Sequence, residues 1–325
     1  MQLSPTSPLV SVALCTYNGE RYLREQLESI LAQRDVRLDI VAVDDASQDG
    51  TMALLQTYAI RDSRLRVAAN ERNLGPLRSF ERAMALCGGE FIAPSDQDDI
   101  WDPHKLSALL AAIGDADLVY CDSEYIDGDG RRSGRRLSEG GTMMSGRTPL
   151  QFVFANSVSG HASLLRRSLF DAACPFPDDI FHDWWLAMCA AAGRGVVYLD
   201  QPLVQYRRHD AAFSPIGRDH GGRDHSRTPS RNRVWLAERC RLLEAFAAHR
   251  LPGHEPAAEL LATLRQAMMG GSALPLMRSL WRERDAAPPG NGSQMFNALR
   301  LQARVLNKLR RARNEPEPAA PRFKL

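Results

Sequence analysis

Short apolar runs alternate with amphipathic segments through the first part of the chain. The runs are four to seven residues long, the usual length of buried strands, and they cover residues 9–15, 38–43, 65–68, 91–94 and 117–121. Between them apolar residues recur at helical spacing, as at Leu23, Leu27 and Ile30. Strands that alternate with helices at this interval predict an α/β domain built on a mostly parallel, doubly wound sheet.

Polar motifs follow three of the predicted strands. They are Thr16-Tyr17-Asn18 after the first strand, Asp44-Asp45 after the second and Asp96-Gln97-Asp98-Asp99 after the fourth. In doubly wound sheets the carboxyl ends of the strands form the crevice in which ligands bind. We therefore expect the two acidic motifs to face a single crevice.

The acidic motif after the fourth strand predicts a metal site. Asp96 and Asp98 are two residues apart, a spacing at which an extended chain sends both side chains to one side. Like charges at the end of a buried strand repel unless something positive meets them. A hard divalent metal ion binds oxygen ligands and keeps coordination positions open for phosphate oxygens. The alternative is that Asp98, Asp99 and Asp102 only cap the helix that begins at Pro103, a role that fits Asp102 well.

Beyond residue 121 the pattern changes. Residues 131–147 are polar and glycine-rich and predict an excursion from the domain. Two polar blocks follow, Ser159-Gly160-His161 and a helix start at His182-Asp183-Trp184-Trp185. After a further strand at 196–199 the domain closes with Arg207-Arg208-His209. These blocks are the remaining candidates for chemistry.

The chain divides into three predicted parts. Residues 1–212 form the α/β domain, residues 213–233 a flexible basic linker or lid, and residues 234–325 a helical extension. The linker repeats Gly-Arg-Asp-His, but the spacing of His220 and His225 matches no usual metal site.

The last predicted helix interleaves leucine and valine with basic residues. Six cations and no acid lie in this stretch: Arg300, Arg304, Lys308, Arg310, Arg311 and Arg313. Such a basic amphipathic helix is either a solvated face or a contact with a partner or an anionic membrane surface. Both interpretations remain open from the sequence.

Composition and sequence pattern argue against disordered, secreted and membrane-spanning proteins. The 325 residues are 44% hydrophobic and 25% charged with a net charge of +2, as in globular proteins, and no particular partner follows from the charge. Six cysteines form no C-x-x-C pair and indicate buried thiols in a reducing compartment. Residues 1–8 lack the basic residues of a signal peptide, and no apolar run approaches membrane-spanning length. We expect a cytoplasmic protein, at the inner face of the cell membrane if its basic helix binds lipid.

In this order and spacing the motifs resemble those of the inverting family-2 glycosyltransferases, which have a GT-A fold. They are most similar to bacterial rhamnosyltransferase-like members that build cell-surface polysaccharide. The resemblance covers about residues 9–210 and includes Asn73-x-Gly75 as well as the motifs above; the chain beyond about residue 212 has none. It implies a transferase that moves one sugar, plausibly L-rhamnose, from a dTDP- or UDP-linked donor to a saccharide or lipid-linked saccharide.

The resemblance implies roles for the first strand ends in nucleotide binding. Thr16, Tyr17 and Asn18 would line the base and ribose, and Asp45 or Asp44 would accept a hydrogen bond from the imide N–H of uracil or thymine. Arg78, one turn into the next helix, would assist with phosphate. An acidic turn whose helix is capped by Ser47 or Asp49 explains the second motif equally without a ligand.

The motif that contains Asp96, Asp98 and Asp99, the acidic triplet, would hold the metal in such an enzyme. Asp98 would coordinate Mg²⁺ or Mn²⁺ bridging the diphosphate, with Asp96 nearer the ribose or the water shell of the ion. His209, with Arg207 and Arg208, resembles the element that closes over the pyrophosphate in that family, and His209 would also contact the metal. An exposed basic cluster is the alternative.

Asp183 would be the general base that takes the proton of the acceptor hydroxyl. Gly160, His161, Trp184 and Trp185 would contact the acceptor. A capping role for Asp183 and core positions for His161 and one of the two tryptophans are the alternatives, since adjacent helical positions point in different directions.

Other functions fit less well. A nucleotide-sugar pyrophosphorylase needs a glycine-rich basic loop after the first strand, and a dinucleotide oxidoreductase needs G-x-G-x-x-G there; both are absent. A catalytically silent scaffold that joins a membrane-bound assembly through the basic helix would have no use for uncompensated acids at Asp96, Asp98 and Asp183.

Overall fold

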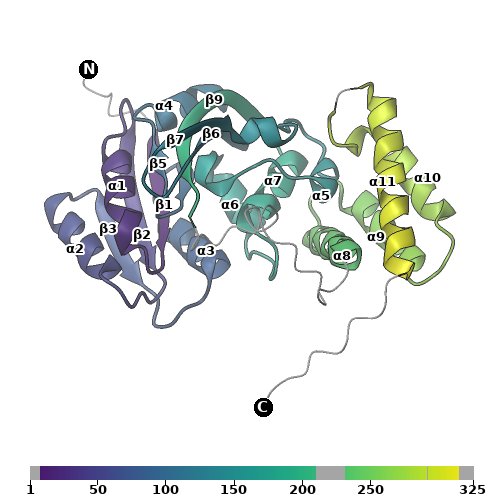
Figure 1. The fold of residues 1–325 in the computed structure, drawn as a ribbon, viewed down its shortest axis with the longest axis horizontal. Helices are drawn as coiled ribbons and strands as arrows, with labels where there is room; N and C mark the ends of the chain where they lie inside the picture. The colour runs from purple at the N-terminus through teal and green to yellow at the C-terminus, as the bar shows by residue number, and fades with distance from the viewer. Residues whose placement is uncertain (1–7, 210–230, 291, 315–325) are drawn as a thin grey trace, which may run out of the picture. The chain divides into compact units, whose positions relative to one another are not determined.

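The computed structural model describes residues 8–209, 231–290 and 292–314, and the chain falls into two compact units (Figure 1). The first comprises Met1–Arg147 and Asn156–Phe213, and the second Thr148–Ala155 and Ser214–Leu325. Most of the predicted linker, residues 213–230, lies outside the described residues, and so do His220 and His225. The three-part division predicted above therefore stays a prediction.

The first unit is built on a nine-stranded sheet. Its path is β3-β2-β1-β4-β8-β6-β9-β5, and β7 pairs with β6 outside this path. The strands are β1 (Leu9–Thr16), β2 (Arg37–Asp44), β3 (Leu65–Ala69), β4 (Phe91–Ser95), β5 (Ile100–Trp101), β6 (Leu118–Ile126), β7 (Arg132–Arg136), β8 (Ser163–Arg166) and β9 (Val196–Arg207).

The first half of the sheet is parallel, as predicted. β1 pairs in parallel with β2 and β4, and β2 with β3. Thr16 lies opposite Asp44, and Leu14 lies opposite Ser95, so the ends of β1, β2 and β4 are aligned. The helices that return the chain are α1 (Glu20–Leu31), α2 (Thr51–Arg61) and α3 (Pro76–Leu86). The three polar motifs consequently emerge at one edge.

The second half of the sheet is mixed, and its antiparallel strands were not predicted from the sequence. β8 is antiparallel to both β4 and β6, whereas β6 and β9 are parallel. A parallel return needs a long crossover, usually a helix. Before β8 the chain has only the short elements β7, η1 (Leu137–Gly140), α5 (Gln151–Phe154) and η2 (Gly160–Ala162), so it enters β8 from the opposite end.

Apolar residues at alternate strand positions face the helices. Val10, Val12 and Leu14 of β1 join one buried cluster with apolar residues of α1, α2 and α4 (Lys105–Ala112). α3 packs against β1 and β2 outside that cluster, with Phe80 buried. Burial on both faces explains why these strands read as nearly continuous apolar runs.

Two helices after β8 complete the unit. α6 (Arg167–Ala173) is short, and α7 (His182–Ala192) begins and ends where the sequence predicts. The strand predicted at 196–199 continues to Arg207 as β9, because it pairs with β6 along most of its length despite irregular register near Asp122. This extension carries Arg207 and His209 to the acidic edge.

The second unit is helical. Besides α5 it contains α8 (Arg231–His249), α9 (His254–Met268), α10 (Leu274–Arg282), η4 (Arg284–Ala286) and α11 (Gln294–Asn314). Its buried residues include Leu236, Phe246, Leu260 and Val305. Among the described residues, none of the helices has the length and apolar character needed to cross a bilayer.

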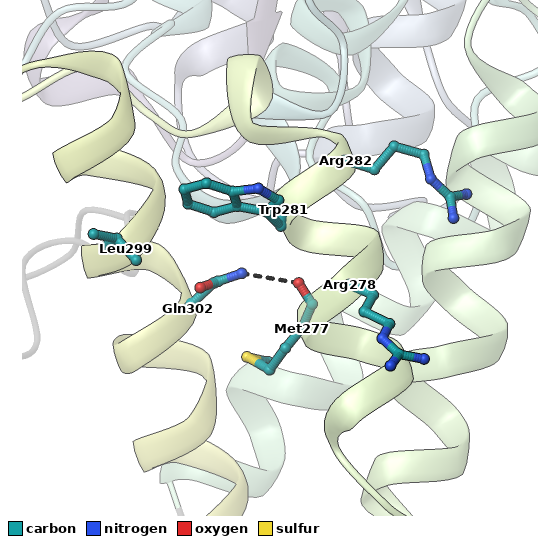
Figure 2. Close-up of a pocket in the computed structure, with 6 residues that line it drawn as sticks. All are labelled: Met277, Arg278, Trp281, Arg282, Leu299 and Gln302. Atoms are coloured by element: carbon teal, nitrogen blue, oxygen red, sulfur yellow. Dashed lines mark hydrogen bonds between the residues drawn. The ribbon is translucent and has the colours of Figure 1, made fainter.

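A hollow of about 720 Å³ lies between α10 and α11 (Figure 2). Met277 and Trp281 of α10 and Leu299 of α11 supply apolar surface, and Gln302 Nε2 donates to Met277 O at 2.8 Å. Arg278 and Arg282 of α10 also line the hollow, and in Figure 2 their side chains extend away from α11. This hollow belongs to the second unit alone, while the sequence motifs lie on the first.

Candidate active site

The ends of β1 and β2 are joined by Asp44. Thr16 Oγ1 donates to Asp44 Oδ1 at 2.8 Å, and the Ser47 hydroxyl and amide donate to the same carboxylate at 2.6 and 2.9 Å. Thr16 and Asp44 are both buried. Asp44 therefore organises the turn after β2, and its carboxylate is occupied by protein donors. The N-cap of α2 is Gly50, without a side-chain capping bond, so neither Ser47 nor Asp49 is the cap that the alternative interpretation named.

Asp45 fixes the loop between β3 and α3. Its carboxylate accepts hydrogen bonds from Asn70 Nδ2 at 2.6 Å, from Leu74 N at 2.8 Å and from Gly75 N at 2.9 Å. The side chain is buried. The loop Asn73-x-Gly75 is thus held against the end of β2, and a nucleotide base would meet a carboxylate already engaged by the protein.

Gln97 clamps the turn after β1. Its Oε1 accepts from Tyr17 N at 2.8 Å and its Nε2 donates to Tyr17 O at 3.0 Å. A Cβ at Gly19 would lie 2.2 Å from Gln97 Oε1, so this arrangement requires glycine there. Tyr17 remains 46% exposed, and Asn18 N donates to Ser47 Oγ at 2.9 Å. Tyr17 is the predicted base-binding residue that presents a free face.

Arg78 is engaged within the protein. Its guanidinium pairs with Glu81 and Asp178 and donates to Phe176 O at 3.0 Å. It therefore ties α3 to the segment before α7. A phosphate contact at Arg78 would require these partners to be exchanged, and its predicted role stays a prediction.

Asp98 and His209 meet, although the chain separates them widely. His209 Nε2 lies 2.8 Å from Asp98 Oδ2, and both side chains are mostly buried. Arg207 supports the pair because its Nε donates to Asp98 O at 2.8 Å and its amide donates to Asp99 Oδ1 at 3.1 Å. The predicted metal residues Asp98 and His209 are thus brought together.

Asp96, Asp99 and His161 form a second cluster. Each offers one ligand atom, and these atoms lie within 4.8 Å of one another. Asp99 is fully buried, and its Oδ2 has no hydrogen-bond partner among the described residues. Carboxylate oxygens with one imidazole suit Mg²⁺ or Mn²⁺. An orphaned buried carboxylate oxygen is the observation that fits a bound cation best, since it is otherwise costly.

The acids of this cluster resist ionisation. Burial, followed by the charges of Asp98 and Asp183, raises the pKa of Asp96 to about 7. Burial, then Asp98 and Asp96, holds the pKa of Asp99 well above its usual range. A divalent cation would reverse both shifts by favouring the charged forms.

Lys105 lies fully buried at the start of α4. Its ammonium donates to His161 O and sits 3.1 Å from the centre of the Trp101 ring. Burial lowers the pKa of Lys105 to about 7, against the opposing effect of nearby acidic groups that include Asp99 and Asp96. Lys105 is therefore a buried part of the candidate active site rather than a surface residue.

His161 is a buried neutral imidazole. Its ring stacks on Tyr206 with centroids 4.6 Å apart, its Nε2 lies 3.1 Å from Ser123 Oγ, and its Nδ1 lies 3.8 Å from Asp96 Oδ2. Burial, then the charges of Lys105 and His182, lowers its pKa to about 3. His161 therefore sits on the metal side of the crevice rather than beside an acceptor only.

Asp183 lies at the same edge as the acidic triplet. Its carboxylate bonds to the Gly160 amide, and the next residue, His161, has a ring nitrogen within 4.8 Å of ligand atoms of Asp96 and Asp99. The Trp184 amide donates to Asp183 Oδ1 at 2.6 Å. Burial nevertheless raises the pKa of Asp183 to about 6. A carboxylate with this pKa can accept a proton near neutral pH.

The two tryptophans after Asp183 separate as helical geometry requires. Trp185 is 1% exposed, and its Nε1 donates to Ala173 O at 2.8 Å. The predicted acceptor contact of Trp185 is therefore wrong, because this side chain belongs to the core. Trp184 is partly exposed and keeps its predicted role as a proposal.

Gly160 is required by a neighbouring side chain. A Cβ at this position would lie 2.6 Å from His182 Nε2. The His182 ring stacks on Phe80 with centroids 4.2 Å apart. Gly160, which was predicted to contact the acceptor, has no side chain and so leaves room for the His182 ring. Its amide bonds to the Asp183 carboxylate.

Comparison with known proteins identifies this arrangement. The family model described as glycosyl transferase family 2 matches residues 11–173, half of the 325-residue chain. The chain belongs to glycosyl transferase family 2. The matched part contains all three strand-end motifs and His161, whereas Asp183 and His209 lie beyond it.

Several relatives by sequence are also named as glycosyltransferases. The chain is 30% identical over 215 residues to a Bacillus subtilis protein provisionally named glycosyltransferase EpsH, with 62% of each chain covered. It is 36% identical over 118 residues to the B. subtilis protein provisionally named teichuronic acid biosynthesis glycosyltransferase TuaG. That match covers 36% of this chain and 47% of TuaG. The chain thus spans less than two thirds of the length of either relative.

Solved structures confirm the predicted GT-A fold. S. aureus TarS 1-349, in complex with UDP-GlcNAc, superposes with a TM-score of 0.57 at 18% identity, covering 94% of this chain and 89% of that one. The mannosyltransferase PcManGT from Pyrobaculum calidifontis, in complex with GDP-Man and Mn²⁺, gives a TM-score of 0.50 at 18% identity, with 96% and 88% covered. At this identity the likeness establishes the fold.

Three residues of this family-2 site escaped the sequence analysis. Asp99 belonged to the quoted acidic motif but was given no ligand role, Arg207 was grouped with His209 without a contact of its own, and Lys105 had no predicted role. Asp99 and Arg207 stand beside recognised motif positions, which is a usable signal. For Lys105 the only signal is its position at the start of a helix whose other turns are apolar.

We expect Gly160→Ala to destabilise the first unit by about 1–3 kcal/mol, because the added methyl group overlaps His182. Urea unfolding measures the change, and Gly88→Ala, where a Cβ meets no atom within 4 Å, is the matched control. Combining Gly160→Ala with His182→Ala relieves the overlap, so the double variant should lose less than the sum of the single losses. Strict additivity would contradict the contact.

Proposed function

We propose that this protein is an inverting glycosyltransferase that moves one sugar from a nucleoside-diphosphate donor to a saccharide acceptor. The observation that carries the proposal is the convergence of Asp96, Asp98 and Asp99 with Asp183 at one edge of the sheet. Family membership supports the reaction class. The two sets of acids differ in surroundings, which suits them to different tasks.

The acidic triplet fits a divalent cation. Asp96, Asp98 and Asp99, with His161 or His209, would hold Mg²⁺ or Mn²⁺, and the unpartnered Asp99 Oδ2 supports this assignment. When bound, the ion supplies positive charge that stabilises the leaving nucleoside diphosphate. PcManGT was solved with Mn²⁺, in keeping with such a site on this fold.

Asp183 acts as the general base. Its carboxylate takes the proton from the acceptor hydroxyl while that oxygen attacks the anomeric carbon. The bond from this carbon to the diphosphate oxygen breaks on the opposite face, and its electrons leave with the diphosphate. One displacement inverts the configuration through a transition state with oxocarbenium character. The Gly160 and Trp184 amides hold the carboxylate in place during the transfer.

The donor and acceptor belong to cell-surface polysaccharide chemistry. TarS binds UDP-GlcNAc and PcManGT binds GDP-Man, so this fold serves several bases and sugars. We propose a dTDP- or UDP-linked donor, plausibly carrying L-rhamnose, whose base packs on the exposed Tyr17. The name of TuaG supports a saccharide or lipid-linked saccharide acceptor, which the partly exposed Trp184 would contact. A silent scaffold explains neither the raised pKa of Asp183 nor the orphaned Asp99 oxygen.

We also propose that the second unit rests on the inner face of the cell membrane. α11 carries six cations without an acid, and Arg310 and Arg311 are exposed. Phe296 and Leu299 of the same helix are about half exposed, and Trp281 lies across the hollow from Leu299 (Figure 2). Exposed aromatic and aliphatic groups beside cations are typical of helices that lie on anionic lipid.

Asp183→Asn should lower kcat about 10²- to 10⁴-fold with little change in donor KM, because a general base is lost. The assay measures nucleotide release with Mn²⁺ across UDP-, dTDP- and GDP-sugars in the presence of a saccharide acceptor. For the wild type, kcat should rise with pH and level off above about 6, where Asp183 is ionised. Asp171→Asn, an exposed acid on α6, is the control. Undiminished turnover by the Asp183 variant would remove it from the base role.

Chelation should abolish tight binding of the donor nucleotide. Calorimetry with UDP and dTDP, with Mn²⁺ or with EDTA, measures this effect. Asp98→Asn should weaken Mn²⁺ binding by at least about 10- to 100-fold. Loss of a residue that only supports a metal ligand already has an effect of this size. The exposed Asp115, changed to Asn, should leave it unaltered. Equal nucleotide affinity in EDTA would refute the metal assignment, and no binding at all would favour the scaffold.

Changing Arg310 and Arg311 to Gln should weaken binding to phosphatidylglycerol vesicles about 30-fold, since each cation near an anionic surface contributes about 1 kcal/mol. Vesicle flotation measures the partition, with neutral phosphatidylcholine vesicles alongside. Arg34 and Arg61, exposed cations of the first unit, are the matched pair for substitution. Equal partition onto neutral and anionic vesicles would contradict the proposed contact of α11 with anionic lipid.

A further inference from the structure

Lys105 is a fully buried cation at the acidic edge of the first unit. A buried ammonium is costly unless something compensates it. Among the described residues it forms no ion pair within 4 Å, so no single carboxylate compensates it. Its hydrogen bond to His161 O and its position over the Trp101 ring hold the ammonium in place instead.

The ammonium lies beside the acidic cluster, because its acceptor His161 has a ring nitrogen within 4.8 Å of ligand atoms of Asp96 and Asp99. Its charge favours ionisation of both Asp96 and Asp99, and their charges act back on it. Because the bonds of Nζ go to a main-chain oxygen and an indole face, they occupy no carboxylate oxygen. Asp99 Oδ2 keeps no partner among the residues described. The cation therefore offsets negative charge while leaving the ligand atoms open.

The hydrogen bond of Lys105 also joins the two halves of the site. Lys105 begins α4, which follows the acidic triplet, and its acceptor His161 lies in η2 beside Gly160. The Gly160 amide in turn contacts Asp183. Displacement of Nζ would loosen η2 against the acidic triplet.

We propose that Lys105 is a built-in countercharge that stabilises the acidic cluster when no metal is bound and limits its affinity for a divalent cation. Lys105 is a positioning residue, since it acts through the acids and through η2. The inference rests on the metal site of the proposed function. Removing its charge makes the cluster more negative, which favours the metal-bound state over the metal-free state.

The test compares Lys105→Met, which removes charge and donor, with Lys105→Gln, which removes the charge but retains a donor. Lys308→Met is the matched control, because Lys308 also lies over an indole ring, that of Trp235, in the second unit. Calorimetric titration with Mn²⁺ gives the affinity, and thermal unfolding with and without Mn²⁺ gives the stability of each state. Circular dichroism confirms that each variant is folded.

Both Lys105 variants should unfold at a lower temperature than the wild type without metal, and should bind Mn²⁺ about tenfold more tightly, as loss of one nearby charge implies. Mn²⁺ should raise their unfolding temperatures more than that of the wild type. A residue with only a packing role would lower stability without tightening metal binding. Mn²⁺ affinity in a folded Lys105 variant equal to or weaker than that of the wild type overturns the inference alone. A wild type that binds no Mn²⁺ overturns it together with the proposed metal site.

Discussion

Repulsion among carboxylates packed at the end of one strand is the constraint on which the site depends. Asp96, Asp98 and Asp99 follow β4 directly, and water reaches them unequally, since Asp99 is fully buried whereas the Asp96 side chain is 44% exposed. The protein answers with basic side chains drawn from distant segments: Arg207 at the end of β9, His209 just beyond it, and Lys105 at the start of α4. Each is fixed by other bonds, so the acids are held close without being neutralised by direct pairing alone.

The sheet makes this concentration of charge possible. Parallel pairing of β1, β2 and β4 aligns three strand ends, and the long β9 returns the chain to the same edge. The polar contacts between these segments are specific: Asp45 holds the loop before α3, and the Gly160 amide meets Asp183. The core beneath is apolar, and rigid strands therefore present the reactive groups with little freedom.

Much of this could be predicted from the sequence because it depends on local pattern. Strand ends, the acidic motifs and the helix start at Asp183 follow from periodicity and short-range spacing. The pairing of Asp98 with His209 followed from family resemblance. The mixed second half of the sheet could not be predicted, since strand direction depends on how the chain returns. The buried state of Lys105 and Trp185 depends on neighbours that fold against them, and periodicity does not report those neighbours.

The clamp of Gln97 on Tyr17 has a consequence for substitution at position 19. The amide occupies space that any side chain larger than hydrogen at position 19 would fill. A larger residue at position 19 would displace the Gln97 amide and with it the two hydrogen bonds to Tyr17. Because Gln97 stands between Asp96 and Asp98, such a displacement would reach the segment that carries the acidic ligands.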